Sequence, residues 1–211
     1  MSDQFAIDLV ALVPGKDDRE TLAGLIEARQ PSLAIRPIRA EVLVHPRRDP
    51  GCFHEAPALL QTFQRRAQRA LVLFDHEGSG QENRPASELE RDLEARLATY
   101  GWPDRAKVIV IEPELEIWVW SNSPQVELAV GWHGRRPGLR RWLADNNYWP
   151  AGQPKPARPK ECLDAALRAG GVRRSSSIFR QLAETVGLER CQDSKFLQLK
   201  RLLALWFPKG A

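Results

Sequence analysis

The chain lacks the features that would place it in a membrane or outside the cell. No apolar run approaches the roughly 20 residues that cross a bilayer. The first four residues lack the basic start of a secretory signal peptide. The three cysteines, Cys52, Cys162 and Cys191, are far apart and include no Cys-x-x-Cys pair, so neither a disulfide framework nor a zinc site is indicated. These absences favour a soluble cytoplasmic protein with reduced thiols and no membrane partner.

Two common catalytic patterns are also missing. The chain contains no phosphate-cradling Gly-x-x-x-x-Gly-Lys-[Ser/Thr] motif, and no Ser-His-Asp arrangement can be assembled from it. The histidine at position 76 is expected to point to the opposite face of its strand from its two acidic neighbours. His45 and His54 flank a predicted loop and could approach the acidic residues, but solvated positions are expected for them and for His133. Nucleotide hydrolysis by a P-loop and serine-based acyl transfer are therefore not indicated.

The first half of the chain alternates between short apolar runs and amphipathic segments. Apolar runs predict strands at residues 5–13, within 33–44, at 70–74 and at 107–111, and helical spacing predicts helices at 19–29, 56–68 and 87–97. Residues 45–55 are predicted to form a loop. This alternation is typical of an α/β fold with a mainly parallel sheet covered by helices on both faces.

The second half has a different character. All seven tryptophans lie from Trp102 onward, and residues 131–159 are rich in proline, glycine and aromatic residues. Helices are predicted at about 160–169, 176–186 and 195–205. We therefore expect an α/β core over residues 1–125 and a basic, mostly helical extension over residues 126–211, packed on or beside the core.

The net charge of +4 is unevenly distributed. Residues 1–132 hold 15 Lys and Arg against 21 Asp and Glu, a balance of −6, and residues 133–211 hold 16 against 6, a balance of +10. The asymmetry indicates either two surfaces with different partners or a basic tail that folds against the acidic half.

Acidic residues follow three of the predicted strands. They are Asp17 and Asp18 after the first, Asp75 and Glu77 after the strand at 70–74, and Glu112, Glu114 and Glu116 after the last. If these strands are neighbours in a parallel sheet, the carboxylates converge at its carboxyl edge. Mg²⁺ prefers such oxygen ligands and assists phosphoryl chemistry. The alternative is that the acids only cap helices and solvate loops.

Basic and aromatic residues alternate in the second half. The candidate nucleic-acid contacts are Arg135, Arg136, Arg140, Arg141, Lys155, Arg173 and Arg174. Cations neutralise phosphates, and exposed aromatic rings such as Trp149 can stack on unpaired bases. The alternative is that the tryptophans belong to the core.

Three short motifs resemble a TOPRIM domain, the acidic metal-binding fold of topoisomerases, primases and OLD-type nucleases. They are Val13-x-Gly15-x-x-Asp18, Asp75-x-Glu77, and Glu112-x-x-x-Glu116-x-Trp118. The likeness covers roughly residues 5–125. It is greatest to the small stand-alone TOPRIM-like proteins of bacterial defence islands, including those of methylation-associated phage-defence systems.

The resemblance implies a Mg²⁺-dependent nuclease with metal ligands at Asp75, Glu77, Glu114 and Glu116. Active members carry a catalytic glutamate just before the glycine of the first turn, where this chain has Pro14. Asp17 or Asp18 is then the candidate catalytic acid. The alternatives are a non-catalytic subunit that docks onto other defence-system proteins, and a regulatory protein that uses only its basic half.

Overall fold

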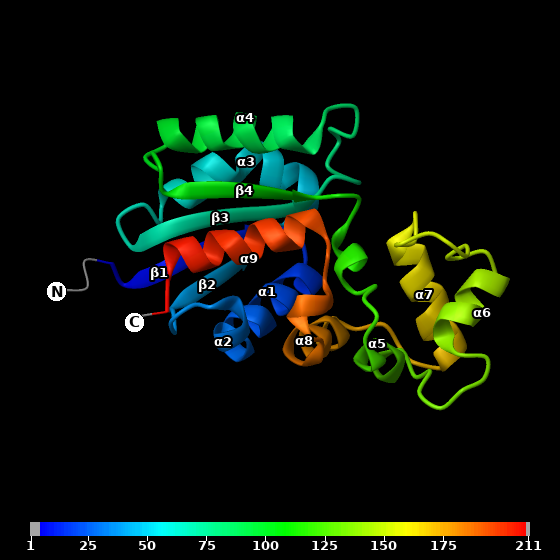
Figure 1. Cartoon of the computed structure of the whole chain (residues 1–211). Helices are drawn as coiled ribbons and strands as arrows, with labels where there is room; N and C mark the ends of the chain where they lie inside the picture. Colours follow the sequence, from blue (N-terminus) through cyan, green and yellow to red (C-terminus); the bar gives the residue numbers. More distant parts are fainter. Residues whose placement is uncertain (1–4, 210–211) are drawn as a thin grey trace.

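Four strands form one parallel sheet with the order β2-β1-β3-β4 (Figure 1). The computed structural model describes residues 5–209, with the side chain of residue 190 left out. The strands are β1 (Ile7–Val13), β2 (Ala40–Val44), β3 (Ala67–Asp75) and β4 (Ala106–Ile111). The predicted α/β architecture with a parallel sheet between helices is confirmed.

The central strands are apolar because both of their faces are covered. Every residue of β1 is buried, and alternate residues point to opposite layers of helices. Leu9 and Leu71 face one layer, whereas Val10 and Val72 face the other. A strand of this kind appears in the sequence as an unbroken apolar run, which explains why these strands could be recognised.

Helices cover each face of the sheet. One face packs against α3 (Arg48–Gln61) and α4 (Ala86–Thr99). The other packs against α1 (Lys16–Ala28), α2 (Gln30–Leu33), α8 (Ser176–Thr185) and α9 (Ser194–Trp206). The last two helices come from the C-terminal part of the chain and complete the second layer, α8 lying along α1 and α9 reaching β4 (Figure 1).

The predicted loop at residues 45–55 is wrong over most of its length, because α3 begins at Arg48. Pro50 and Gly51 suggested a break, but both lie in the first turn of the helix. Proline is tolerated there because the first N–H groups of a helix have no partner within the helix. The correction places Asp49 in that first turn.

The remaining helices form a group beyond the carboxyl ends of the strands (Figure 1). This helical lobe comprises α5 (Pro124–Ala129), α6 (Leu139–Asp145) and α7 (Pro159–Gly170), with their connections. The short helix η1 (Leu115–Trp118) connects β4 to this lobe, and η2 (Leu188–Arg190) lies between α8 and α9 of the core. Within the lobe, the ring of Trp142 contacts those of Trp132 and Tyr148. The centroid distances are 4.8 Å to Trp132 and 6.0 Å to Tyr148.

Side chains of α4 bond to the outer strand β4, and a side chain of α9 bonds to one of them. Glu90 accepts a hydrogen bond from the backbone N–H of Val110 at 3.0 Å, and Glu94 accepts one from Val108 at 3.1 Å. The ammonium group of Lys195, on α9, donates to Glu90 at 2.7 Å. The outer strand is thus bonded to α4, and Glu90 links α4 to α9 of the other helical layer. In the described part of the chain, no helix is long and apolar enough to span a membrane.

Candidate functional site

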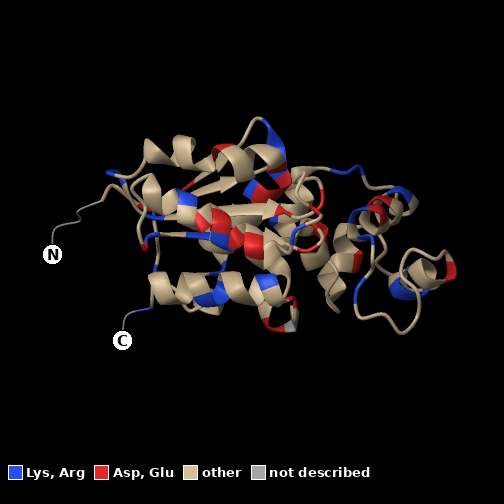
Figure 2. Cartoon of the chain, turned by 90° about the horizontal axis from the view of Figure 1, so that it is seen from above, with Lys and Arg blue, Asp and Glu red and all other residues tan. Residues whose placement is uncertain are grey.

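The strand order places a ligand-binding position at the carboxyl ends of β1 and β3. From β1 the chain crosses to β2 on one side, and from β3 it crosses to β4 on the other. Parallel sheets bind ligands in the crevice that opens where the winding direction changes. The acidic residues near this point are called the acid edge; they are Asp17, Asp18, Asp49, Asp75, Glu77, Glu114 and Glu116. Red segments gather there in Figure 2, at the end of the sheet that faces the helical lobe.

Asp18 and Asp75 are the most constrained members of the acid edge. Asp18 lies in the first turn of α1 and is only 6% exposed. Asp75 is the last residue of β3, and although part of it reaches solvent, its Oδ1 atom is buried. Within the described residues, neither Asp18 Oδ1 nor Asp75 Oδ1 has a hydrogen-bond partner. Burying an unpaired carboxylate oxygen is costly, so this arrangement needs a proton or a bound ligand.

Burial and mutual repulsion raise the pKa values of these carboxyl groups. Burial, followed by the charge of Asp49, raises the pKa of Asp18 to about 8. Burial, followed by the charges of Asp18 and Asp49, raises the pKa of Asp75 well above its usual value. Burial and the charge of Glu116 raise the pKa of Glu114 to about 7. Perturbed carboxyl groups of this kind concentrate at functional sites.

Asp49 belongs to this group although the sequence did not indicate it. Its Oδ1 atom accepts a hydrogen bond from the backbone N–H of Asp75 at 2.9 Å, which fixes the end of β3. Burial raises the pKa of Asp49. The acidic residue was visible in the sequence, but the segment was predicted to be a loop, and a helix start beside the sheet edge was not foreseen.

The other predicted acidic residues take different positions. Glu114 and Glu116 are buried at the start of η1, and the Oε1 atom of Glu114 accepts a hydrogen bond from the backbone N–H of Lys160 at 2.9 Å. Glu77 is exposed beyond β3. Asp17 accepts a hydrogen bond from the hydroxyl of Ser176 at 2.6 Å.

Arg174 reaches the acid edge from the loop between α7 and α8. Its guanidinium donates to Glu116 at 2.5 Å and to Asp17 at 2.9 Å. A second nitrogen donates to Asp164, on α7, at 2.8 Å. This residue therefore joins the helical lobe, α1 and η1 at one point.

The chemistry of the acid edge fits a hard divalent cation. All of its side-chain donors are carboxylate oxygens, which Mg²⁺ prefers, and Mg²⁺ commonly takes one or two carboxylates together with water. The unpartnered oxygens of Asp18 and Asp75 supply two such donors. Among the residues described, no three acidic, histidine or cysteine side chains are grouped closely enough to enclose an ion. We therefore assign the fit to two carboxylates and not to a preformed cage.

Most of the candidate nucleic-acid contacts are engaged within the protein. Arg135 and Arg140 each donate to two backbone carbonyl groups, Arg141 pairs with Asp145 at 2.8 Å, and Lys155 donates to the carbonyl of Ile117 at 2.9 Å. Arg136 and Arg173 are exposed and make no ion pair or hydrogen bond within residues 5–209. These two side chains are the ones most available to a phosphate.

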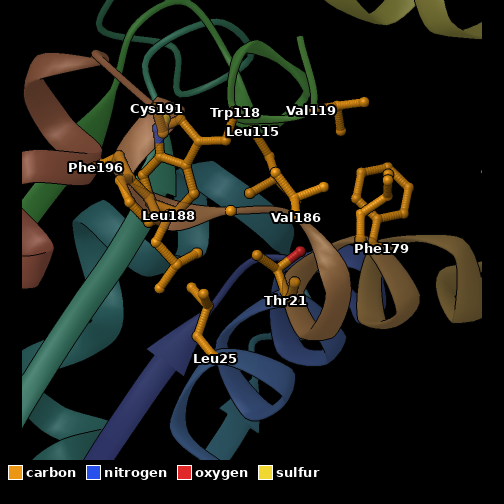
Figure 3. A pocket seen from close by; sticks show the side chains of 13 residues that line it. Thr21, Leu25, Leu115, Trp118, Val119, Phe179, Val186, Leu188, Cys191 and Phe196 are labelled. Atoms are coloured by element: carbon orange, nitrogen blue, oxygen red, sulfur yellow. The ribbon is translucent and has the colours of Figure 1, made fainter. Parts of the chain in front are cut away.

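A small apolar pocket of about 50 Å³ lies between α1, η1 and α8 (Figure 3). Thr21 and Leu25 of α1, Leu115 and Trp118 of η1, and Phe179 of α8 line it together with residues near Cys191. At this volume the pocket is too small to hold a substrate.

A larger cleft of about 1010 Å³ separates the helical lobe from the start of α9. Its walls include Trp120 and Trp149, whose rings meet edge to face with centroids 5.6 Å apart. Lys155 and Asp193 add opposite charges to the lining. A cleft of this size accommodates a small molecule or a short stretch of another chain.

No family model, no curated protein and no solved structure matches this chain.

Proposed function

We propose that this chain is a TOPRIM-like component of a bacterial antiviral defence system that binds nucleic acid and cleaves it with the help of Mg²⁺ at the acid edge. The observation that carries the proposal is the pair of buried oxygens on Asp18 and Asp75, which lack a partner in the described part of the chain, at the point where the sheet changes winding direction. The three motifs shared with TOPRIM domains support the same position, since each of them contributes residues to the acid edge.

Each residue of the acid edge has a role in this proposal. Asp18 and Asp75 hold the ion, and Asp49 fixes the backbone that carries Asp75. When bound, Mg²⁺ neutralises charge that develops on a phosphoryl group and lowers the pKa of a bound water. Glu114, whose pKa is about 7, exchanges a proton readily near neutral pH. Arg173 and Lys160 are exposed cations near this edge and attract the phosphate backbone.

Two observations favour a second candidate, a non-catalytic subunit of a larger defence complex. Pro14 is buried where active TOPRIM enzymes carry a glutamate, so the usual catalytic acid is missing. The cleft of about 1010 Å³ beside the helical lobe offers a place for a segment of a partner protein. In this role the acid edge would bind a cation without cleaving nucleic acid.

A cleavage assay separates the two candidates. Labelled single-stranded and duplex DNA are incubated with the wild-type protein and with Asp18→Asn and Asp75→Asn, in Mg²⁺ or Mn²⁺. We expect wild-type cleavage and a loss of about 100-fold or more in each variant, because each removes a charged ligand of the ion. Equal cleavage by wild type and Asp75→Asn would contradict the assignment of the site.

Asp8→Asn is the matched control. Asp8 is a buried aspartate near the start of β1, at the opposite end of the sheet, where it accepts hydrogen bonds from Arg36 and Arg39. Its substitution tests for general damage to the sheet and should leave cleavage unchanged. If a folded wild-type protein binds Mn²⁺ but cleaves none of the substrates, the docking role is favoured.

A further inference from the structure

Among the side chains that the structure describes, Arg174 is the only cation that forms an ion pair with the acid edge. Its guanidinium contacts Glu116 and Asp17 together, and it also lies over the ring of Phe179 at 5.1 Å. The side chain comes from a segment distant in sequence from both acids. It supplies the positive charge that the acid edge would otherwise take from a bound metal ion.

The guanidinium occupies an oxygen of Glu116, a carboxylate that could join Asp18 and Asp75 as a third ligand of the ion. Glu116 Oε1 accepts a hydrogen bond from Arg174 at 2.5 Å, so it cannot ligate an ion without losing a charge-assisted bond. The positive charge at this point also repels an approaching cation. Asp18, only 6% exposed, has no partner for its Oδ1 atom among the described residues, and that buried oxygen is open to a proton or a ligand.

Phosphate can compete with the carboxylates for Arg174. The guanidinium fork binds carboxylate and phosphate with the same two-point geometry. The Arg174 side chain is 29% exposed, and its neighbour Arg173 is exposed and able to draw a phosphate to the same loop. A phosphodiester that captures Arg174 would release Glu116 and Asp17 at the same time.

We infer that Arg174 is a displaceable internal cation that keeps the acid edge from binding a metal ion until a nucleic-acid phosphate draws its guanidinium away. Metal and nucleic acid then bind cooperatively, and by thermodynamic reciprocity each tightens the other. This inference rests on the proposed metal site and adds the condition under which that site fills. Asp164 is the anchor that holds the guanidinium in its closed position from α7.

Mn²⁺ titrations followed by electron paramagnetic resonance test the inference without any activity measurement. We expect Arg174→Gln to bind Mn²⁺ about 10-fold more tightly than wild type. A single-stranded oligonucleotide should tighten Mn²⁺ binding by wild type and leave Arg174→Gln unchanged, after the signal of oligonucleotide alone is subtracted. Asp164→Asn, which keeps Arg174 but loosens it, should give an intermediate affinity and serves as the second variant if Arg174→Gln does not fold.

Arg180→Gln is the matched control. Arg180 also joins α8 to α1 by ion pairs, to Glu20 and Glu27, but none of its partners belongs to the acid edge. Its loss should leave Mn²⁺ affinity unchanged.

The outcomes separate this inference from the proposed function. Equal or weaker Mn²⁺ binding by Arg174→Gln, with binding abolished in Asp75→Asn, would overturn the role of Arg174 and leave the metal site standing. Absence of Mn²⁺ binding in both wild type and Arg174→Gln would overturn the metal site and the inference together.

Discussion

At the acid edge, Asp18 and Asp75 each bury a carboxylate oxygen that has no partner among the described residues, whereas in the helical lobe Arg135 and Arg140 each donate to two backbone carbonyl groups. The first region holds charge that is poorly compensated, and the second uses charge to fix its own loops. The net charges, −6 for the first 132 residues and +10 for the remainder, do not reveal which charged side chains are compensated within the fold. Whether a charged residue is available to a ligand depends on the contacts it makes within the fold.

The largest expected effect is at Asp18. Its pKa, about 8, means that the folded protein holds a proton that the unfolded chain loses near pH 4, so stability should fall as the pH rises from about 4 to 8. In metal-free buffer at pH 8.5, Asp18→Asn should raise the free energy of unfolding by about 2–4 kcal/mol. Near pH 4 the two proteins should differ little. Urea denaturation at both pH values measures this.

Asp17→Asn is the neighbouring control and should act in the opposite direction. Asp17 is paired with Arg174 and accepts a hydrogen bond from Ser176. Removing its charge should lower the free energy of unfolding by about 1 kcal/mol. If both substitutions destabilise the protein at pH 8.5, then a buried, ionised Asp18 does not lower the stability of the folded protein.

The next effect is at Arg140 in the helical lobe. Its guanidinium donates to the carbonyls of Trp149 and Pro150 and lies 4.3 Å from the centre of the Trp149 ring. Arg140→Ala should lower the free energy of unfolding by about 2 kcal/mol, because two carbonyl groups and one ring face lose their partner. Chemical denaturation measures this change. The control is Arg136→Ala, an exposed-site variant whose free energy of unfolding should change by less than about 0.5 kcal/mol.

A smaller effect concerns nucleic-acid binding. Arg136 and Arg173 are exposed, so replacing both with glutamine should weaken binding uniformly across sequences and reduce the salt slope of log affinity by about 1 per residue. Fluorescence anisotropy at several salt concentrations measures the slope. An unchanged slope would mean that these two side chains do not meet phosphate.

The smallest effect is expected at Arg141, next to Arg140 in sequence. Arg141 forms an exposed ion pair with Asp145 one helical turn away, at 2.8 Å. Such pairs contribute about 0.5 kcal/mol or less. If Arg141→Ala lowers the free energy of unfolding as much as Arg140→Ala does, the contrast between engaged and exposed cations is contradicted.

The helices and strands that the sequence predicts correctly are those marked by the spacing of apolar residues over a short stretch of chain. The sequence predicts strands β1, β3 and β4 to within a few residues of their bounds. A strand that is buried on both faces is a short, unbroken apolar run, which is easily recognised in a sequence. The helices α7, α8 and α9 also agree with the ranges predicted from helical spacing. The order of the strands was not predictable, because it depends on how the helices that connect the strands pack against the sheet.

The site was predictable where acids directly follow strands and was missed where they do not. Asp18 and Asp75 could be placed because the carboxyl ends of parallel strands share an edge. Asp49 was missed because Pro50 and Gly51 imitate a loop within a first helical turn. The pairing of Arg174 with Glu116 joins residues 58 positions apart, and no local spacing encodes it.

The contacts of Glu90 and Glu94 with β4 bear on how this molecule can assemble. A free row of N–H groups on an outer strand is a template for strand addition from another chain. Here two of those groups, on Val108 and Val110, already donate to carboxylates, and Lys195 holds one of the carboxylates in place. A partner strand would have to displace a buried ion pair to align with β4. Recruitment into an edge-to-edge assembly is therefore disfavoured on this side, and a partner protein gains more by binding helices and loops.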